Sequence, residues 1–183
     1  LTIVGLPEAA VRESKDRVRS AILNSGFQFP NRRLTINLAP ADLPKDGARL
    51  DLPIAIGILA ASDQLEPEVL SVFEFIGELA LNGNLRQVTG SLAVARAIKA
   101  EALASKVLQV ANITEQELSE PREKPQTSQL MVPIDNGAEA SRVDGVTILA
   151  AQSLKTVCDH LQSLANPSAA YESLDVVQPS PAQ

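Results

Sequence analysis

The hydrophobic residues of this chain follow two spacings that alternate along its length. Short apolar runs and strict alternation, as at Leu34, Ile36 and Leu38, are typical of strands. Apolar residues three or four positions apart, as at Val18 and Ile22, are typical of one helix face. The strand spacing predicts strands at residues 2–4, 33–38, 73–81, 85–88, 130–132 and 146–149. The helix spacing predicts helices at residues 8–25, 50–62, 91–102, 139–143 and 152–164.

Turn and helix-start residues support these boundaries. Asn82-Gly83 is a strong signal for a hairpin turn between residues 73–81 and 85–88. Pro53 falls in the first turn of a predicted helix, where its missing N–H costs little. Since strands and helices alternate and the chain has one hairpin, the sequence predicts the α/β class, a mixed sheet with packed helices.

The connection between the third helix and the next strand is the least defined part of the pattern. Residues 119–128 contain no apolar residue and two prolines, which predicts a flexible excursion. Residues 102–110 either extend the preceding helix or include a strand at residues 107–110. The pattern leaves both alternatives open over this stretch, which looks like an insertion at residues 101–126.

The last residues of the chain have a different composition from the rest. After Ala165 the sequence turns polar and contains three prolines. Such a composition is typical of a linker rather than a fold element. We therefore expect one folded domain at residues 1–164, cut at Leu1 inside a longer protein, and a flexible linker at residues 165–183.

Composition and charge remove several classes of function. The chain has 183 residues with 22 acidic and 16 basic side chains, a net charge of −6, and only 3% aromatic residues. One Cys and one His exclude an intramolecular disulfide framework and a Cys/His zinc site, so we expect no metal. No apolar run approaches the roughly 20 residues that span a bilayer, so we expect no membrane contact. The acidic balance and the scarce aromatics argue against bulk nucleic-acid binding and base stacking.

The charge is unevenly distributed along the sequence. Residues 1–50 carry eight basic and five acidic groups, or +3, and the remainder carries −9. The basic end could contact DNA or a neighbouring subunit, and the candidate residues are Arg12, Lys15, Arg19, Arg32, Arg33 and Arg49. The alternative is a solvated helix face whose charges pair locally, as Glu13 and Arg17 can four residues apart.

Few residues outside these charges point to chemistry. The chain contains neither a G-x-x-x-x-G-K-[ST] nor a G-x-G-x-x-G motif, so it lacks the usual phosphate cradle. We interpret His160, the only His, as a surface residue and Cys158 as core filling. Asp42, Asp46 and Asp51 match no EF-hand spacing, and Asp51 more simply helps to start a helix.

Four motifs occur in order along the first half of the chain. They are Val4-Gly5-Leu6-Pro7-Glu8, the run from Asn37 through Pro44-Lys45-Asp46-Gly47, Asp51-Leu52-Pro53-Ile54-Ala55, and Gly77-Glu78-Leu79-Ala80-Leu81. Together they resemble the N-terminal region of the magnesium-chelatase-like AAA+ competence family, ComM and its close relatives. The likeness covers most of residues 1–164. In that family the region begins a few dozen residues earlier and continues, after a linker, into an AAA+ ATPase module.

The resemblance implies a Lon-protease-like fold of the ribosomal S5 domain 2 type. In Lon proteases a Ser two residues after a P-K-D-G run is the nucleophile, and a Lys after a G-E-x-x-L-x-G hairpin is its base. Both motifs are present here, as Pro44-Lys45-Asp46-Gly47 and as Gly77, Glu78 and Gly83. However, the catalytic positions fall on Arg49 and Leu92, and the neighbouring Ser91 has no evident base. We therefore expect no peptidase activity.

The resemblance also implies what the longer protein does. Family members are expected to be hexameric ATP-driven motors that promote branch migration on DNA during natural transformation. ATP and Mg would belong to the ATPase module, and the present segment would need no cofactor. It would then be a cytoplasmic accessory domain for ring assembly, DNA guidance or partner docking. The alternatives are a protein-interaction module without DNA contact, which the net charge of −6 favours, and a magnesium-chelatase-type subunit domain.

Overall fold

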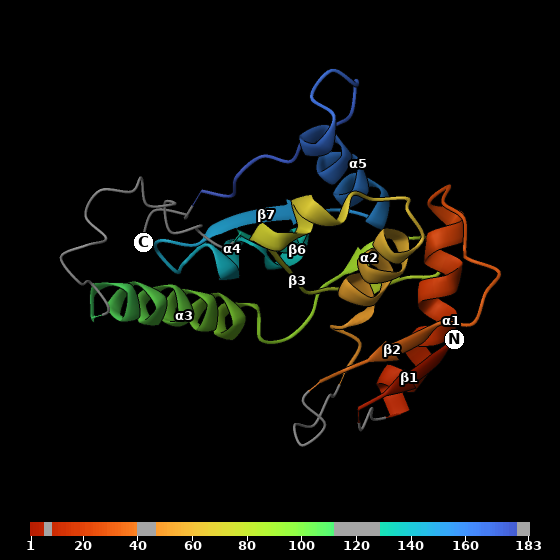
Figure 1. Cartoon of the computed structure of the whole chain (residues 1–183), viewed down its shortest axis with the longest axis horizontal. Helices are drawn as coiled ribbons and strands as arrows, with labels where there is room; N and C mark the ends of the chain where they lie inside the picture. The colour runs from red at the N-terminus through yellow and green to blue at the C-terminus, as the bar shows by residue number, and fades with distance from the viewer. Residues whose placement is uncertain (6–8, 40–46, 112–128, 179–183) are drawn as a thin grey trace.

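The computed structural model describes residues 1–5, 9–39, 47–111 and 129–178, of which 9–12 and 105–111 are described as backbone only (Figure 1). The α-helices are α1 (Ala9–Asn24), α2 (Asp51–Ala61), α3 (Ser91–Ala111), α4 (Gly137–Ala140) and α5 (Leu154–Ala165), and the 3-10 helices are η1 (Pro67–Val72) and η3 (Ile134–Asn136). The strands are β1 (Thr2–Val4), β2 (Thr35–Asn37), β3 (Phe73–Phe75), β4 (Glu78–Leu79), β5 (Leu85–Arg86), β6 (Gln129–Pro133) and β7 (Thr147–Ala151). This alternation confirms the predicted α/β class.

The strands form small separate sheets rather than the single mixed sheet that we expected. β3, β6 and β7 form a three-stranded parallel sheet in that order, and β1 and β2 form a parallel pair. β4 and β5 form the antiparallel hairpin that the Asn82-Gly83 turn predicted. The hairpin attaches to the end of β7, because the Leu85 N–H donates to the Gln152 carbonyl at 2.8 Å.

The stretch 73–81, predicted as one strand, divides into β3 and β4. Ile76 still follows β6, since its N–H donates to the Met131 carbonyl at 3.1 Å. The next residue leaves the sheet: the Gly77 N–H donates to the Arg49 carbonyl at 2.9 Å, and its carbonyl accepts from Leu52. The strand prediction was wrong there because the backbone of Gly77 pairs with the loop before α2.

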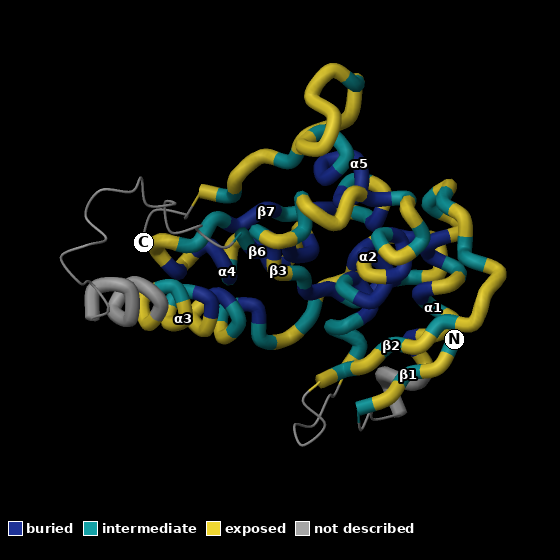
Figure 2. Tube along the Cα trace, viewed as in Figure 1, coloured by how far each residue is buried: buried dark blue, intermediate teal, exposed yellow. Residues whose placement is uncertain are grey.

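The three-stranded sheet lies between two hydrophobic clusters. Met131, Leu149 and Ala151 point into the first cluster, which also holds the buried faces of α1, α2 and α5. Leu130, Val132 and Ile148 point into the second cluster, with Ala95 and Ile98 of α3. Successive side chains of a strand face opposite sides, so β6 and β7 contribute to both clusters. Figure 2 shows these two strands as mostly buried.

Helix α2 is the most apolar element, as predicted from a sequence that is apolar nearly all round. Leu52, Ala55 and Leu59 are fully buried, and α1 packs against it through Val18 and Ile22. Helix α3 is longer than the predicted residues 91–102, which confirms the helical alternative for residues 102–110. Its first turns pack on the second cluster, whereas Leu103 is 53% exposed.

The segment after α5 was predicted to be a linker, but part of it returns to the domain. Val176 forms an antiparallel bridge with Leu149, and the Val177 N–H donates to the Ile148 carbonyl at 2.9 Å. Leu174 packs against the first cluster and Val177 against the second. Leu174, Val176 and Val177 therefore pack on the domain. The predicted end of the folded domain at residue 164 stays a prediction.

Candidate functional site

The structure joins two of the sequence motifs through their backbones. The loop that ends at Arg49 and the first turn of α2 bind the residue that opens the hairpin, Gly77. Its N–H donates to the Arg49 carbonyl at 2.9 Å, and its carbonyl accepts from the Leu52 N–H at 3.0 Å. The hairpin motif thus positions the start of α2.

Asp51 is the polar centre of this junction. Its carboxylate is fully buried and accepts from Arg17 Nε at 2.7 Å and from Arg17 Nη2 at 3.1 Å. It also accepts from the Leu79 N–H of β4 at 3.2 Å. The bond with Asp51 raises the pKa of Arg17 above its ordinary value. Asp51 begins α2 as expected, but no side chain caps that helix, and its carboxylate binds α1 and the hairpin instead.

The glycines of the hairpin motif are explained by packing. A Cβ on Gly77 would lie 2.9 Å from Leu85 Cδ2, inside the buried contact between hairpin and α2. Gly83 has φ +87, and a Cβ there would lie 2.4 Å from Ser25 Oγ. Glu78 lies across the hairpin from Arg86, with 3.6 Å between Oε1 and Nη1. Gly47 has φ +70, and the other P-K-D-G residues, Pro44, Lys45 and Asp46, lie outside the described residues.

Arg49 and Leu92, the two positions at which the resemblance led us to look for a peptidase dyad, lie on different elements. Arg49 is half-buried in the loop before α2, where its carbonyl holds Gly77. Leu92 is half-buried in the first turn of α3 and packs against the second cluster. A guanidinium and an isobutyl group have neither a nucleophile nor a titratable base. The Arg49 guanidinium can donate hydrogen bonds, and the Leu92 side chain can pack against apolar neighbours.

Ser91 has a carboxylate partner that the sequence did not reveal. It is fully buried at the start of α3, and its hydroxyl donates to Glu139 Oε2 of α4. Asn136 Nδ2 donates to the Ser91 Oγ at 3.3 Å and to the Val88 carbonyl at 2.8 Å, and its Oδ1 accepts from the Val88 N–H at 2.9 Å. The expectation that Ser91 lacks a base partner is therefore corrected. Its full burial makes this cluster a connection between α3 and α4.

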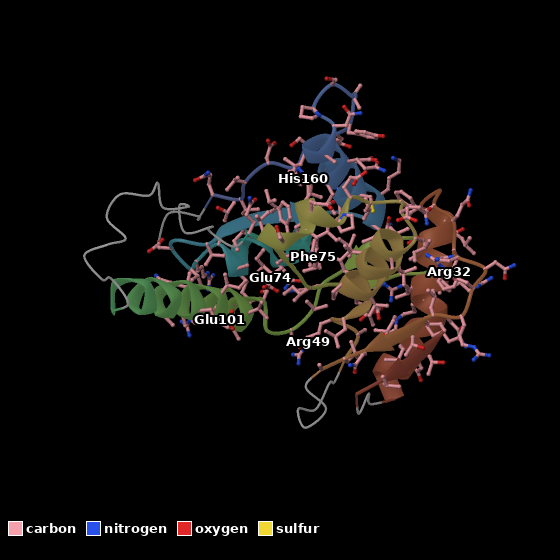
Figure 3. The ribbon with its side chains drawn as sticks, viewed as in Figure 1. Arg32, Arg49, Glu74, Phe75, Glu101 and His160 are labelled. Atoms are coloured by element: carbon pink, nitrogen blue, oxygen red, sulfur yellow. The ribbon has the colours of Figure 1, made fainter. Side chains whose placement is uncertain are left out.

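Four of the candidate contact residues, Lys15, Arg19, Arg32 and Arg33, are exposed within residues 15–33, and we refer to these four cations as the basic surface. Lys15 and Arg19 lie one turn apart on α1, and the Arg19 guanidinium lies 4.7 Å from the centre of the Phe29 ring. Arg32 donates to the Ala61 carbonyl at the end of α2 and is labelled in Figure 3. All four are exposed, while Glu13 and Asp16 lie exposed on the same helix. Arg49, the fifth candidate, lies away from Arg32 in Figure 3. The side chain of Arg12, the sixth, is outside the described part of the chain.

His160 is buried, which corrects its interpretation as a surface residue. It is 6% exposed, because the segment that returns after α5 covers it. The Leu174 N–H donates to His160 Nδ1 at 3.0 Å, and Phe73 meets the ring edge-on. Burial lowers the pKa of His160. Cys158 fills the core as predicted, and burial raises the pKa of its thiol.

The described residues contain neither a metal-binding cluster of side chains nor a membrane-spanning helix. They contain no group of three or more His, Cys, Asp or Glu side chains placed to hold a metal ion. Among the helices in the described ranges, none is both long and apolar enough to cross a bilayer.

The sequence matches the family described as subunit ChlI of Mg-chelatase over residues 1–112. It is also similar to proteins named YifB: 41% identical over 97% of this chain to that of Salmonella typhimurium, and 44% over 88% to that of Escherichia coli. These alignments cover 32% and 27% of the two relatives. The competence protein ComM of Haemophilus influenzae is 65% identical over 89 residues, 49% of this chain and 18% of that protein.

These likenesses and the α/β fold define a class of Mg-chelatase-like proteins, to which the four motifs had pointed. The chain belongs to the Mg-chelatase-like family that includes subunit ChlI and ComM. It spans about a third or less of the length of the curated relatives that it matches.

Proposed function

We propose that the chain is a non-catalytic accessory domain of an AAA+ ATPase that resembles the ComM branch-migration helicase of natural transformation. Its role there is ring assembly, DNA guidance or partner docking. The observation that carries the proposal is the basic surface of Lys15, Arg19, Arg32 and Arg33, whose cations are exposed on a domain of net charge −6. Such a surface attracts an anionic partner without any catalytic group.

DNA guidance is the first form of this proposal. Phosphate contacts require positive charge and reach rather than a fixed pocket. Arg19 rests against Phe29, and Arg32 is held at the end of α2, so two of the four cations are oriented before any partner arrives. Orientation in advance lowers the entropy cost of binding.

A salt titration of DNA binding tests this form. Fluorescence anisotropy of a labelled duplex would be followed as the chain is added, from low to physiological salt. Four phosphate contacts predict a slope of about −3.6 in log K against log salt. No binding at the lowest salt would remove DNA guidance for this domain and leave protein docking.

Protein docking is the second form, and the net charge favours it. The acidic remainder of the domain repels DNA at long range. An acidic patch on a neighbouring subunit would contact the basic surface directly and pair with its cations at short range. The longer protein would be a hexamer in the cytoplasm, with ATP and Mg in an AAA+ module. A magnesium-chelatase-type role in metal insertion is the remaining alternative.

The absence of peptidase chemistry is a separate part of the proposal. We propose a Lon-protease-like fold whose dyad positions have become Arg49 and Leu92. The described surroundings support this, because both residues serve the junction or the core. Incubation with unfolded casein should leave the casein intact, and cleavage that disappears in Ser91→Ala would contradict this part.

A further inference from the structure

The residues after α5 form a short segment that we call the C-terminal strap, Ser173–Val177. It contacts the domain at both of its ends. Near its start, the Leu174 N–H donates to His160 Nδ1 at 3.0 Å, and the Ser173 Oγ lies 3.2 Å from the same nitrogen. Near its end, the Val177 N–H donates to the Ile148 carbonyl at 2.9 Å. Figure 1 shows this segment passing back from α5 toward β7.

The strap pairs with β7, one edge of the parallel sheet, at a single bridge. β7 pairs with β6 on one side, and Val176 forms an antiparallel bridge with Leu149 on the other. Unpaired edge strands attract other chains, and proteins commonly cover them. Gly137 provides room, because a Cβ there would lie 3.3 Å from Val177 Cγ2. The strap therefore protects β7 and the second cluster at once.

The hydrogen bond from the Leu174 N–H to His160 requires an unprotonated Nδ1 when the strap is closed. A backbone N–H is only a donor, so Nδ1 must carry a lone pair and the ring proton must sit on Nε2. Protonation of Nδ1 would place two donors face to face and remove the bond. We propose that His160 is the latch of the C-terminal strap: the neutral imidazole holds Ser173–Val177 on α5 and β7, and the imidazolium releases them.

The charged groups around the latch are paired with each other or exposed to solvent. On α5, Lys155 and Asp159 bond each other at 2.8 Å. The exposed acids on the other elements packed here are Glu172 and Asp175 on and beside the strap, Glu66 and Glu68 around η1, and Glu74 on β3. In the described part of the chain, Ser173 and Leu174 are the hydrogen-bond partners of the ring, and Phe73 meets its edge.

The direction of the effect follows from burial. Burial favours the neutral ring and lowers its pKa relative to the ordinary value of about 6.5. The closed strap thus binds fewer protons than the open one. The closed strap is therefore most favoured above about pH 6.5, and the ratio of open to closed strap rises by up to about tenfold for each pH unit below that value. This device goes beyond the proposed function and does not depend on it.

The test is NMR of the ¹⁵N-labelled chain between pH 7.5 and pH 5.0, with the heteronuclear NOE of Leu174 and Val177 as the measure of order. At pH 7.5 both amides should be ordered, and the ¹⁵N shift of His160 Nδ1 should report an unprotonated nitrogen. At pH 5.0 both should become mobile while Leu130 and Met131 stay ordered, which separates strap release from unfolding. A strap that is equally ordered at both pH values would overturn the inference.

Two variants distinguish a latch from a merely packed His. In His160→Asn, Oδ1 takes the place of Nδ1 as an acceptor but does not titrate, so the strap should stay ordered at both pH values. In Val177→Pro, the N–H that binds Ile148 is lost while His160 is retained, so the strap should open and the pKa of His160 should rise. A His160→Asn strap that still opens at pH 5.0, or an unchanged His160 titration in a released Val177→Pro strap, would contradict the latch.

Discussion

The guanidinium of Arg17 on α1 and the fully buried carboxylate of Asp51 on α2 share two hydrogen bonds, at 2.7 and 3.1 Å. Asp51 also accepts from the Leu79 N–H of the hairpin at 3.2 Å. One carboxylate therefore connects three elements that meet at the family motifs. A buried ion pair adds little over apolar packing, but removal of one partner leaves a charge without compensation.

Loss of Arg17 should destabilise the domain strongly. Arg17→Met removes both hydrogen bonds and leaves the Asp51 carboxylate buried, so the free energy of unfolding should fall by about 3–5 kcal/mol. Urea denaturation followed by circular dichroism measures this. Glu13→Gln is the control, because Glu13 is exposed and lies 3.9 Å from Arg17, and it should change stability by less than about 0.5 kcal/mol.

Coupling between the two residues gives a sharper version of the same prediction. Arg17→Met combined with Asp51→Asn removes both charges, so the double variant should be less destabilised than the sum of the single variants by about 1–3 kcal/mol. Additive effects within about 0.3 kcal/mol would mean that the pair does not hold α1 and α2 together.

The hairpin turn requires glycine at position 83. Its φ is +87, and an added Cβ would lie 2.4 Å from Ser25 Oγ, so Gly83→Ala should destabilise the domain by about 1–3 kcal/mol. Gly57→Ala is a matched control, since Gly57 is within α2 and a Cβ there meets no atom within 4 Å. It should stabilise the domain by about 0.5–1 kcal/mol in thermal or urea unfolding. Equal effects in the two variants would contradict the packing explanation.

Asn136 should be essential to the connection between the hairpin and α4. Its side chain satisfies both the N–H and the carbonyl of Val88, at 2.9 and 2.8 Å. Asn136→Ala leaves those groups without their partner and should cost about 1–3 kcal/mol. Asp135→Ala is the neighbouring control, because Asp135 is exposed on the same short helix. An Asn136→Ala protein as stable as wild type would show that water replaces these bonds without cost.

The lowered pKa of His160 predicts a pH dependence of stability. The folded state favours the neutral ring, so the unfolded chain binds more protons between the folded and unfolded pKa values. This contribution is fully present above about pH 6.5 and is lost as the pH falls through the folded pKa. The urea midpoint should therefore decrease from pH 7.5 to pH 5.5 in wild type. The decrease should be smaller in His160→Asn, and an identical decrease would assign it to other groups.

The secondary structure was largely predictable because most elements are held by local patterns. The apolar face of α5 is an example: Leu154, Val157, Cys158 and Leu161 are all buried. Its start also carries a Ser153–Thr156 capping box, which is a local sequence signal for a helix start. The hairpin followed from two turn residues in the same way.

The contacts that define the junctions were not predictable, because they join residues far apart in sequence. Arg17 and Asp51 are 34 positions apart. The local pairing of Arg17 with Glu13 that the spacing predicted is present at 3.9 Å, but it did not reveal the shorter bonds to Asp51. His160 is buried because a segment 13 and 14 positions later returns over it. The three apolar residues Leu174, Val176 and Val177 within a polar tail were the available signal for that return.

Charge reversal on the basic surface tests the central claim most directly. Lys15→Glu with Arg33→Glu reverses two exposed cations of that surface, and Arg96→Glu with Arg142→Glu reverses two exposed cations of α3 and the segment after α4. Both variants carry the same net charge, so a difference between them reports location. The account predicts that DNA affinity at low salt falls at least tenfold in the first variant and much less in the second. Equal losses, or undiminished binding in the first variant, would contradict a role of this surface in DNA contact.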